Sequence, residues 1–207
     1  EMDKERGVII EEINMYEDNP IMHIEDVFEN LLYQGTALGR NISGTRQNIQ
    51  SMSRATLYNY FKKYYFGGNT IFVLGGRFKI PQALALINKH FPINQKQARL
   101  KFKAVKKFQQ KQPQVNIIKR DLEQVQLILG WRHIAGRHKL WLPSQVLINI
   151  LGGTMSSRLF LEIREKRGLC YFIKAFGQGY EDTSSWGIQA GLNKEKIYES
   201  LEAIRSE

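Results

Sequence analysis

The sequence contains almost no cysteine, because Cys170 is the single one among 207 residues. No disulfide can form within the chain, which favours a reducing compartment, and we therefore expect a cytoplasmic protein. Cys170 lies in the apolar stretch GLCYFI. This setting indicates a buried thiol of the core rather than a nucleophile.

Long apolar runs are also absent, and none approaches the length of a membrane-spanning helix. We therefore expect no membrane partner. The first residues, EMDKER, already resemble the interior of a helix and show no signal-peptide pattern. The last residues, IYESLEAIRSE, still follow a helical periodicity. We interpret the chain as part of a longer polypeptide, so the missing signal says little about targeting.

Histidine is scarce, and the four histidines show no spacing that is typical of metal ligands: His23, His90, His133 and His138. The zinc motifs H-E-x-x-H and H-x-x-E-H do not occur. A catalytic zinc ion usually takes three protein ligands, so these histidines do not predict a complete zinc site. For His133 and His138, in the loop-like segment RHIAGRH, we favour surface or structural roles.

Acidic residues are in the minority, with 20 against 30 basic residues and a net charge of +10. Much of the excess lies in RLKFKAVKKFQQKQ, residues 99–112, which has six basic residues and no acid. Phe102 and Phe108 interleave with these charges, a pattern that can stack nucleic-acid bases. A solvated linker between domains explains the same composition. We favour the linker and expect no nucleic-acid partner.

Helical and strand patterns are mixed along the chain, separated by glycine and proline. Helical patterns occupy six ranges: 3–17, 21–36, 53–65, 81–91, 140–153 and 156–168. Strand patterns occupy residues 69–76, parts of 115–133, and the two segments LCYFIKAFGQGY and SSWGIQAGLN, after which a last helix begins. This order predicts an α+β fold with antiparallel pairing. We expect domains over 1–98 and 115–207, joined by a basic linker over 99–114.

Two segments of the first half are expected to be buried. The strand NTIFVLGG, residues 69–76, is apolar on both faces and resembles a central strand. The helix over 53–65 is expected to begin after an N-cap, Ser53, and has an aromatic stripe that we interpret as core packing. The stripe contains Leu57, Tyr60, Phe61, Tyr64 and Tyr65.

The helix over 3–17 has two carboxylates within its apolar surface. Glu5 and Glu12 lie nearly in line, two turns apart, because successive residues turn by about 100°. Apolar side chains fan out on both sides of that line: Val8, Ile9, Ile13, Met15 and Tyr16. Glu5 and Glu12 are therefore expected to point inward, where an unpaired carboxylate is costly. Composition leaves a cation, a metal or a shared proton as the partner and slightly favours an ion pair.

Four segments, in this order, resemble the pitrilysin/insulinase family of zinc peptidases, and most nearly the bacterial relatives of mitochondrial processing peptidase. They are ERGVIIEEI, LGRNISGT, SRATLYNYFKKYYFGGNTIFVLGG and LGGTMSSRLFLEIREKRGLCY. The resemblance covers nearly the whole chain, and SSRLFLEIREKRGLCY is its most specific part. It implies two homologous domains of antiparallel sheet packed with helices, both incomplete here.

The resemblance implies a zinc cofactor. In the family an inverted motif, H-x-x-E-H, supplies two histidine ligands and the general base, and this motif would lie before Glu1. A later glutamate is the third ligand, and Glu12 matches it. Glu5 matches the supporting acid beside the site, where it would orient a ligand or hold a proton.

The same resemblance places Arg164 and Tyr171 in the active site, from the second domain. Both can donate a hydrogen bond to a substrate carbonyl as its oxygen gains charge. Without the resemblance, Arg164 would be interpreted as a surface arginine and Tyr171 as a core aromatic. With it, we favour the catalytic roles.

The resemblance finally implies hydrolysis of unfolded peptides inside a closed chamber, by a homodimer or by a heterodimer with a homologous subunit. We expect these 207 residues alone to be inactive, because two ligands and the base are missing from them. Two alternatives stay open: a non-catalytic partner subunit of such a peptidase, and a nucleic-acid binder that uses the basic segment.

Overall fold

The computed structural model describes residues 1–91, 103–105 and 110–207, and it confirms the predicted α+β class. Its α-helices are α1 (Met2–Asp18), α2 (Pro20–Leu32), α3 (Arg46–Ser51), α4 (Arg54–Tyr64), α5 (Ile80–His90), α6 (Trp141–Gly152) and α7 (Ile197–Ser206). A π-helix, η2, spans Phe160–Lys166, and two 3-10 turns span Gly67–Asn69 and Lys194–Lys196. The strands are β1 (Gln124–His133), β2 (Cys170–Gly179) and β3 (Ser184–Asn193).

These elements form two compact units. The first contains Glu1–Arg6 and Arg46–Lys103, and the second contains Gly7–Thr45 and Ala104–Glu207. Helix α1 thus contributes residues to both. In the part of the chain that the structure describes, no helix is both long and apolar enough to cross a bilayer. Half of the expected linker over 99–114, namely 99–102 and 106–109, lies outside the described residues.

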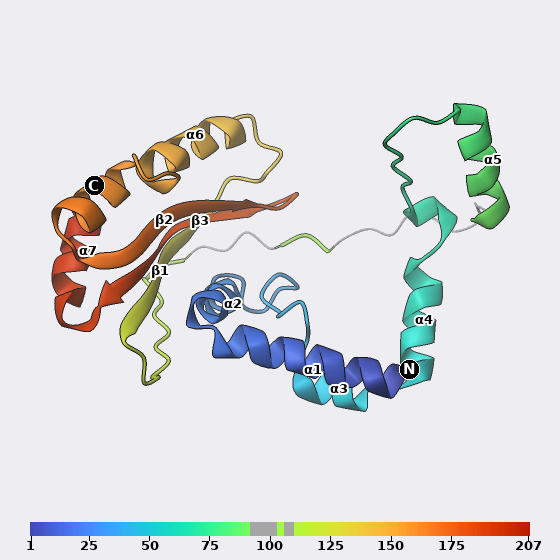
Figure 1. The fold of residues 1–207 in the computed structure, drawn as a ribbon, viewed down its shortest axis with the longest axis horizontal. Coiled ribbons are helices and arrows are strands. Elements are labelled where there is room, and N and C mark those ends of the chain that lie inside the picture. The colour runs from blue at the N-terminus through green and yellow to red at the C-terminus, as the bar shows by residue number, and fades with distance from the viewer. Residues whose placement is uncertain (92–102, 106–109) are drawn as a thin grey trace. The chain divides into compact units, whose positions relative to one another are not determined.

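The second unit is built on a three-stranded antiparallel sheet in the order β1-β3-β2. Figure 1 shows α2 on one side of this sheet and α6 and α7 on the other. Successive strand residues point to opposite faces, so each strand divides its side chains between the two helical layers. On β3, Ile188, Ala190 and Leu192 pack into the core with residues of α6 and α7, while the Gln189 side chain reaches α2.

The core of the second unit lies between the sheet and the layer of α6, η2 and α7. Its buried apolar residues are Ile148, Leu159, Ile163, Leu169, Cys170, Ile173, Ala175, Ile188, Ala190, Leu192, Ala203 and Ile204. Burying one large aliphatic side chain of this kind contributes about 1.5–3 kcal/mol. This cluster therefore supplies much of the stability of the second unit.

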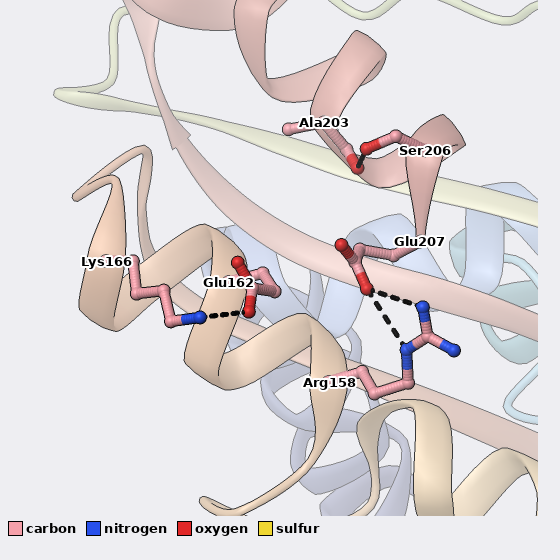
Figure 2. A network of polar contacts seen from close by, with 6 residues as sticks. All are labelled: Arg158, Glu162, Lys166, Ala203, Ser206 and Glu207. Atoms are coloured by element: carbon pink, nitrogen blue, oxygen red, sulfur yellow. Dashed lines mark hydrogen bonds and ion pairs between the residues drawn. The ribbon is translucent and has the colours of Figure 1, made fainter.

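Polar contacts join Arg158, two residues before η2, to Glu207 at the end of α7, as Figure 2 shows. The guanidinium of Arg158 donates to the Glu207 carboxylate from Nε at 3.1 Å and from Nη2 at 3.0 Å. Ser206 closes the last turn of α7 by donating to the Ala203 carbonyl, and Lys166 pairs with Glu162. Exposed pairs of this kind contribute little individually. The buried side chains hold the layer of α6, η2 and α7 on the sheet, and these polar contacts add to its orientation.

The first unit is packed differently, and none of its described residues is buried. The predicted N-cap of α4 is confirmed, because the Ser53 hydroxyl accepts from the Thr56 amide at 3.1 Å. The prediction that the stripe on α4 is core is wrong, since its side chains are exposed or half-buried. The predicted buried strand over 69–76 is also wrong: residues 70–75 have no ladder partner among the described residues, and Ile71 and Val73 are 84% and 90% exposed.

Smaller differences concern the bounds of elements. The short helix α3 was not predicted, because six residues carry too little periodicity. Strand-type residues over 115–121 form no strand, and pairing begins only at Gln124. The predicted helix over 156–168 contains the π-helix η2 instead of a regular α-helix throughout. Two strands and the final helix lie where the sequence predicts them.

Candidate functional site

Glu12 lies on α1, at the edge of a small pocket of about 130 Å³. The pocket is lined by Glu12, Ile13, Tyr16, Glu17, Asp26, Asn41, Ile42 and Ser43. The prediction that Glu5 and Glu12 point inward is wrong, because both residues are exposed. Only Ile13 is buried on α1, whereas Val8 and Met15 are more than half exposed. The predicted apolar surface is thus buried only at Ile13, and both glutamates lie outside the buried part.

A second carboxyl group, that of Asp26 on α2, lines the same pocket and is held by the loop after α2. The Asn41 side chain donates from Nδ2 to Asp26 Oδ2 at 2.7 Å, and its Oδ1 accepts from the Ser43 amide at 2.9 Å. Burial raises the pKa of Asp26 above its usual value, while the nearby His23 acts in the opposite direction. The pocket beside Glu12 therefore includes the half-buried carboxyl of Asp26, and the hydrogen-bond partner of Asp26 also fixes the loop.

The described residues fit one ligand position of a zinc site and no more. Glu12 offers an exposed carboxylate, and neither Glu12 nor Glu5 forms an ion pair within the described ranges. In those same ranges, no group of three or more His, Cys, Asp or Glu side chains could hold a metal ion. Since a catalytic zinc typically needs three protein ligands, this part of the chain cannot complete the site by itself.

Arg164 lies on η2, where buried neighbours fix the backbone. Ile163 is fully buried, and the helix ends at Lys166, two residues before Gly168, whose φ of 58° suits glycine. The Leu169 amide then donates to the Ile163 carbonyl at 3.0 Å. π-Helical turns are rare and occur often at functional sites. The side chain of Arg164 is 40% exposed, so its guanidinium reaches the surface from a rigid base.

Three contacts orient the Arg164 guanidinium. Nε donates to the Tyr171 carbonyl at 2.9 Å, and Nη1 donates to Glu165 Oε1 at 2.8 Å. The guanidinium carbon lies 4.7 Å from the centre of the Phe160 ring. A guanidinium has five N–H donors, so the bonds described here leave donors for another acceptor.

Tyr171 is the bulged residue of β2. Cys170 pairs with Leu192 and Phe172 pairs with Gly191, so Tyr171 has no partner in the β2–β3 register. A bulge changes the direction of a side chain and releases backbone groups from the ladder. The released carbonyl accepts from Arg164, and the Tyr171 side chain is 60% exposed. The structure thus brings Arg164 and Tyr171 together, and it places Glu12 at another location of the same unit.

The other candidate residues have structural roles. Cys170 is buried, as predicted, and burial raises its thiol pKa to about 11, which leaves it protonated near neutral pH. His138 accepts from the Leu140 amide at 3.1 Å, and burial lowers the pKa of His133. Sequence analysis missed the bulge and the bond between Asp26 and Asn41. The segment LGRNISGT signalled a loop, but its partner on α2 could not be inferred from it.

Comparison with known proteins identifies the family. Residues 51–207 match the family described as Peptidase M16 inactive domain. The chain belongs to this peptidase family. Over its full length it is 31% identical to an uncharacterized zinc protease of Streptomyces coelicolor, and over 99% of its length it is 30% identical to one of Bacillus subtilis. It spans 46% and 49% of these relatives, respectively.

Solved structures show the same fold. A peptidase M16 inactive domain from Pseudomonas fluorescens matches 99% of this chain with a TM-score of 0.84 at 19% identity, over 50% of its own length. A protease from Helicobacter pylori matches 97% with a TM-score of 0.77 at 23% identity, also over 50% of its length. The predicted resemblance to zinc peptidases of this family is therefore confirmed, and the α+β fold is the fold of these neighbours.

Proposed function

We propose that this chain is part of a zinc-dependent peptidase that hydrolyses unfolded peptides, and that Arg164 and Tyr171 bind the reacting carbonyl. The observation that carries the proposal is the contact between these two residues across the bulge of β2. An exposed surface arginine would not need a rigid π-helix, an aromatic contact and a released carbonyl to hold it. The relatives named as zinc proteases supply the reaction class.

Arg164 and Tyr171 act on the substrate oxygen. In peptide hydrolysis the carbonyl oxygen gains negative charge as water adds to the carbon. The guanidinium and the phenol each offer N–H or O–H donors, and donors fixed before the reaction stabilise that charge without reorganisation. The bond from Arg164 Nε to the Tyr171 carbonyl holds the guanidinium beside the backbone from which the phenol extends.

Glu12 contributes one carboxylate ligand to the zinc ion, and Glu5, two turns earlier on α1, orients a neighbouring ligand or holds a proton. When bound, zinc polarises the substrate carbonyl and makes water a stronger nucleophile. The remaining ligands and the general base come from a part of the polypeptide outside these 207 residues. This is consistent with relatives about twice as long as the chain.

The wider assignment follows from the same family. We propose a chamber between paired domains, peptides small enough to enter it as substrates, and a homodimer or a heterodimer with a homologous subunit, in the cytoplasm. The alternative is a non-catalytic partner subunit, and it is favoured by one observation: the matching family is described as the inactive domain. The two assignments differ in whether the full-length polypeptide binds zinc and cleaves peptides.

The test is peptide cleavage by the full-length polypeptide, with zinc content measured in parallel. Arg164→Ala should lower kcat by about 100-fold to 1,000-fold, the usual cost of losing one donor to a developing oxyanion, with unchanged zinc content. Tyr171→Phe should act in the same direction. Glu12→Gln should lose zinc and activity together, because it removes an anionic ligand.

A matched control is Arg137→Ala, since Arg137 is an exposed arginine of the same unit that pairs with Glu181. It should change kcat less than twofold. A full-length protein that binds no zinc supports the partner-subunit assignment, and unchanged turnover in Arg164→Ala would refute the role of that residue. Zinc-dependent cleavage by the 207 residues alone would refute the proposed dependence on outside ligands.

A further inference from the structure

Helix α2 contacts the sheet through one line of residues along its whole length. At its start, the Ile21 carbonyl accepts from Gln189 Nε2 at 2.9 Å. One turn later, Glu25 pairs with Lys174 at 3.2 Å. After another turn, Glu29 Oε1 accepts from the Tyr180 hydroxyl at 2.8 Å. At the end, the Leu32 carbonyl accepts from Arg132 Nε at 3.0 Å and Nη2 at 2.7 Å. Spacings of four, four and three residues place all four contacts on one helix face.

An aromatic side chain on the same face fits a slot in the sheet. Phe176, Gly187 and Gly130 pair across the three strands, so the two glycines leave space beside the Phe176 ring. Phe28 fills it and meets Phe176 edge to face, with ring centres 5.9 Å apart. A Cβ on Gly130 would lie 2.6 Å from Phe28 Cε2. The slot therefore exists only because residue 130 is glycine.

Buried residues hold α2 against the sheet at both of its ends. Gln189 is fully buried, and a buried amide is costly unless it is hydrogen-bonded. Its bond to the Ile21 carbonyl therefore strongly favours one position of α2. Tyr33, directly after α2, is also fully buried and meets Tyr180 edge to face at 5.9 Å. The end of α2 is thus held as firmly as its start.

The end of α1 and the start of α2 are held close together. Pro20 opens α2, and Asn19 caps it by accepting from the Ile21 amide at 3.1 Å. Arg120 binds the last turn of α1 by donating to the Glu17 carbonyl at 2.5 Å. Residues of α1 and α2 then line one pocket, which includes Glu12 and Asp26. A shift of α2 on the sheet would therefore move the wall of the Glu12 pocket.

We propose that the α2 face of the sheet positions the Glu12 carboxylate, and that Gly130, Tyr180 and Gln189 are positioning residues for it. The value of this arrangement to the enzyme rests on the proposed function, in which Glu12 is a zinc ligand. None of the three residues needs to touch the metal or the substrate. They act by holding α2 on the sheet, and the position of α2 affects that of α1 and its Glu12.

The test uses Gly130→Ala and Tyr180→Phe in the full-length polypeptide. The first fills the slot, and the second removes the hydroxyl bond to Glu29 without changing the ring. Both should speed amide hydrogen exchange in α1 and weaken zinc binding by about tenfold, the lower range for an outer-shell change. Phe28→Leu, combined with Gly130→Ala, should restore zinc affinity because the ring that meets the new methyl is gone.

Two substitutions of the same type are controls. Gly75→Ala adds a methyl group that meets nothing within 4 Å, and Tyr198→Phe changes a tyrosine that is 87% exposed on α7. Neither should change exchange in α1 or zinc affinity. Amide exchange is measured without metal, so it reports on the coupling even if zinc is absent.

The outcomes separate the two proposals. Faster exchange in α1 with weaker zinc binding, reversed by Phe28→Leu, supports positioning. Unchanged exchange and unchanged zinc affinity in both variants would overturn it. If the wild-type polypeptide binds no zinc, the proposed function fails, and exchange in α1 still decides whether the sheet holds the Glu12 helix. If Gly130→Ala does not fold, Tyr180→Phe gives the decision alone.

Discussion

Both units contain apolar segments, but the apolar side chains are buried in the second unit and largely exposed in the first. In the second unit, β3 has a partner on each side, and Ala190 and Leu192 are fully buried. In the first unit, residues 70–75 are equally apolar, but Ile71 and Val73 lie almost fully exposed. The difference is pairing, because a strand buries its side chains only when neighbouring strands build a face for helices to cover.

This comparison shows which part of the chain holds its own structure. The second unit contains a sheet, two helical layers and a continuous core. The described part of the first unit contains helices whose apolar faces have no such core to cover. Helices of about 11 residues are marginal in water without tertiary packing. Local stability should therefore differ strongly between the units.

The largest expected difference is in amide hydrogen exchange of the 207-residue chain. Amides of β3 should exchange only on global opening of the second unit, which costs about 5 kcal/mol or more. Amides of residues 71–74 should exchange at nearly the rate of an unfolded chain, because no ladder bond protects them among the described residues. Mass spectrometry of peptic fragments measures both. Equal protection of the two segments would remove the distinction between the units.

Truncation of one apolar side chain in each unit should sharpen the same comparison. Leu192→Ala removes a fully buried side chain and should lower the free energy of unfolding by about 2–5 kcal/mol. Val73→Ala, at a position 90% exposed, should change it by less than about 0.5 kcal/mol. Urea unfolding followed by tryptophan fluorescence reports on the second unit, since Trp131 and Trp186 stack there. A large effect of Val73→Ala would show that the first unit contributes to the stability of the second.

The sequence predicted β2, β3 and the final helix of the second unit, because local and tertiary signals agree there. The segments of β2 and β3 have strand-type patterns, are separated by a turn, and pair as neighbours in the sequence. For residues 69–76 the local signal was equally strong, and it failed because strand formation depends on partners. The stripe on α4 failed for the same reason. Periodicity shows which side chains a helix can bury. Whether they are buried depends on another element that packs against them.

The candidate site was predictable only in part. Resemblance to a known family identified Arg164 and Tyr171, and the structure brings them together through the bulge of β2. No sequence pattern indicated that bulge, which arises from a one-residue mismatch between two strands. The inward placement of Glu12 was wrong because α1 buries a single residue, Ile13. The roles of all four site residues, including Glu5, stay predictions that the cleavage and zinc assays address.

The smallest expected effect is a pH dependence confined to the second unit. Burial lowers the pKa of His133 below 6.5, and the positive charge of His138 acts in the same direction. The unfolded chain therefore binds this proton more tightly than the folded one, and the second unit should lose stability as the pH falls below about 6.5. His133→Gln should flatten this dependence in urea unfolding between pH 7.5 and about pH 5. His90→Gln, in the first unit, is the control and should leave the pH dependence unchanged.

A pH dependence that persists in His133→Gln would assign the titration to another group. A flat profile in the wild type would mean that His133 is charged as readily in the folded unit as in the unfolded chain.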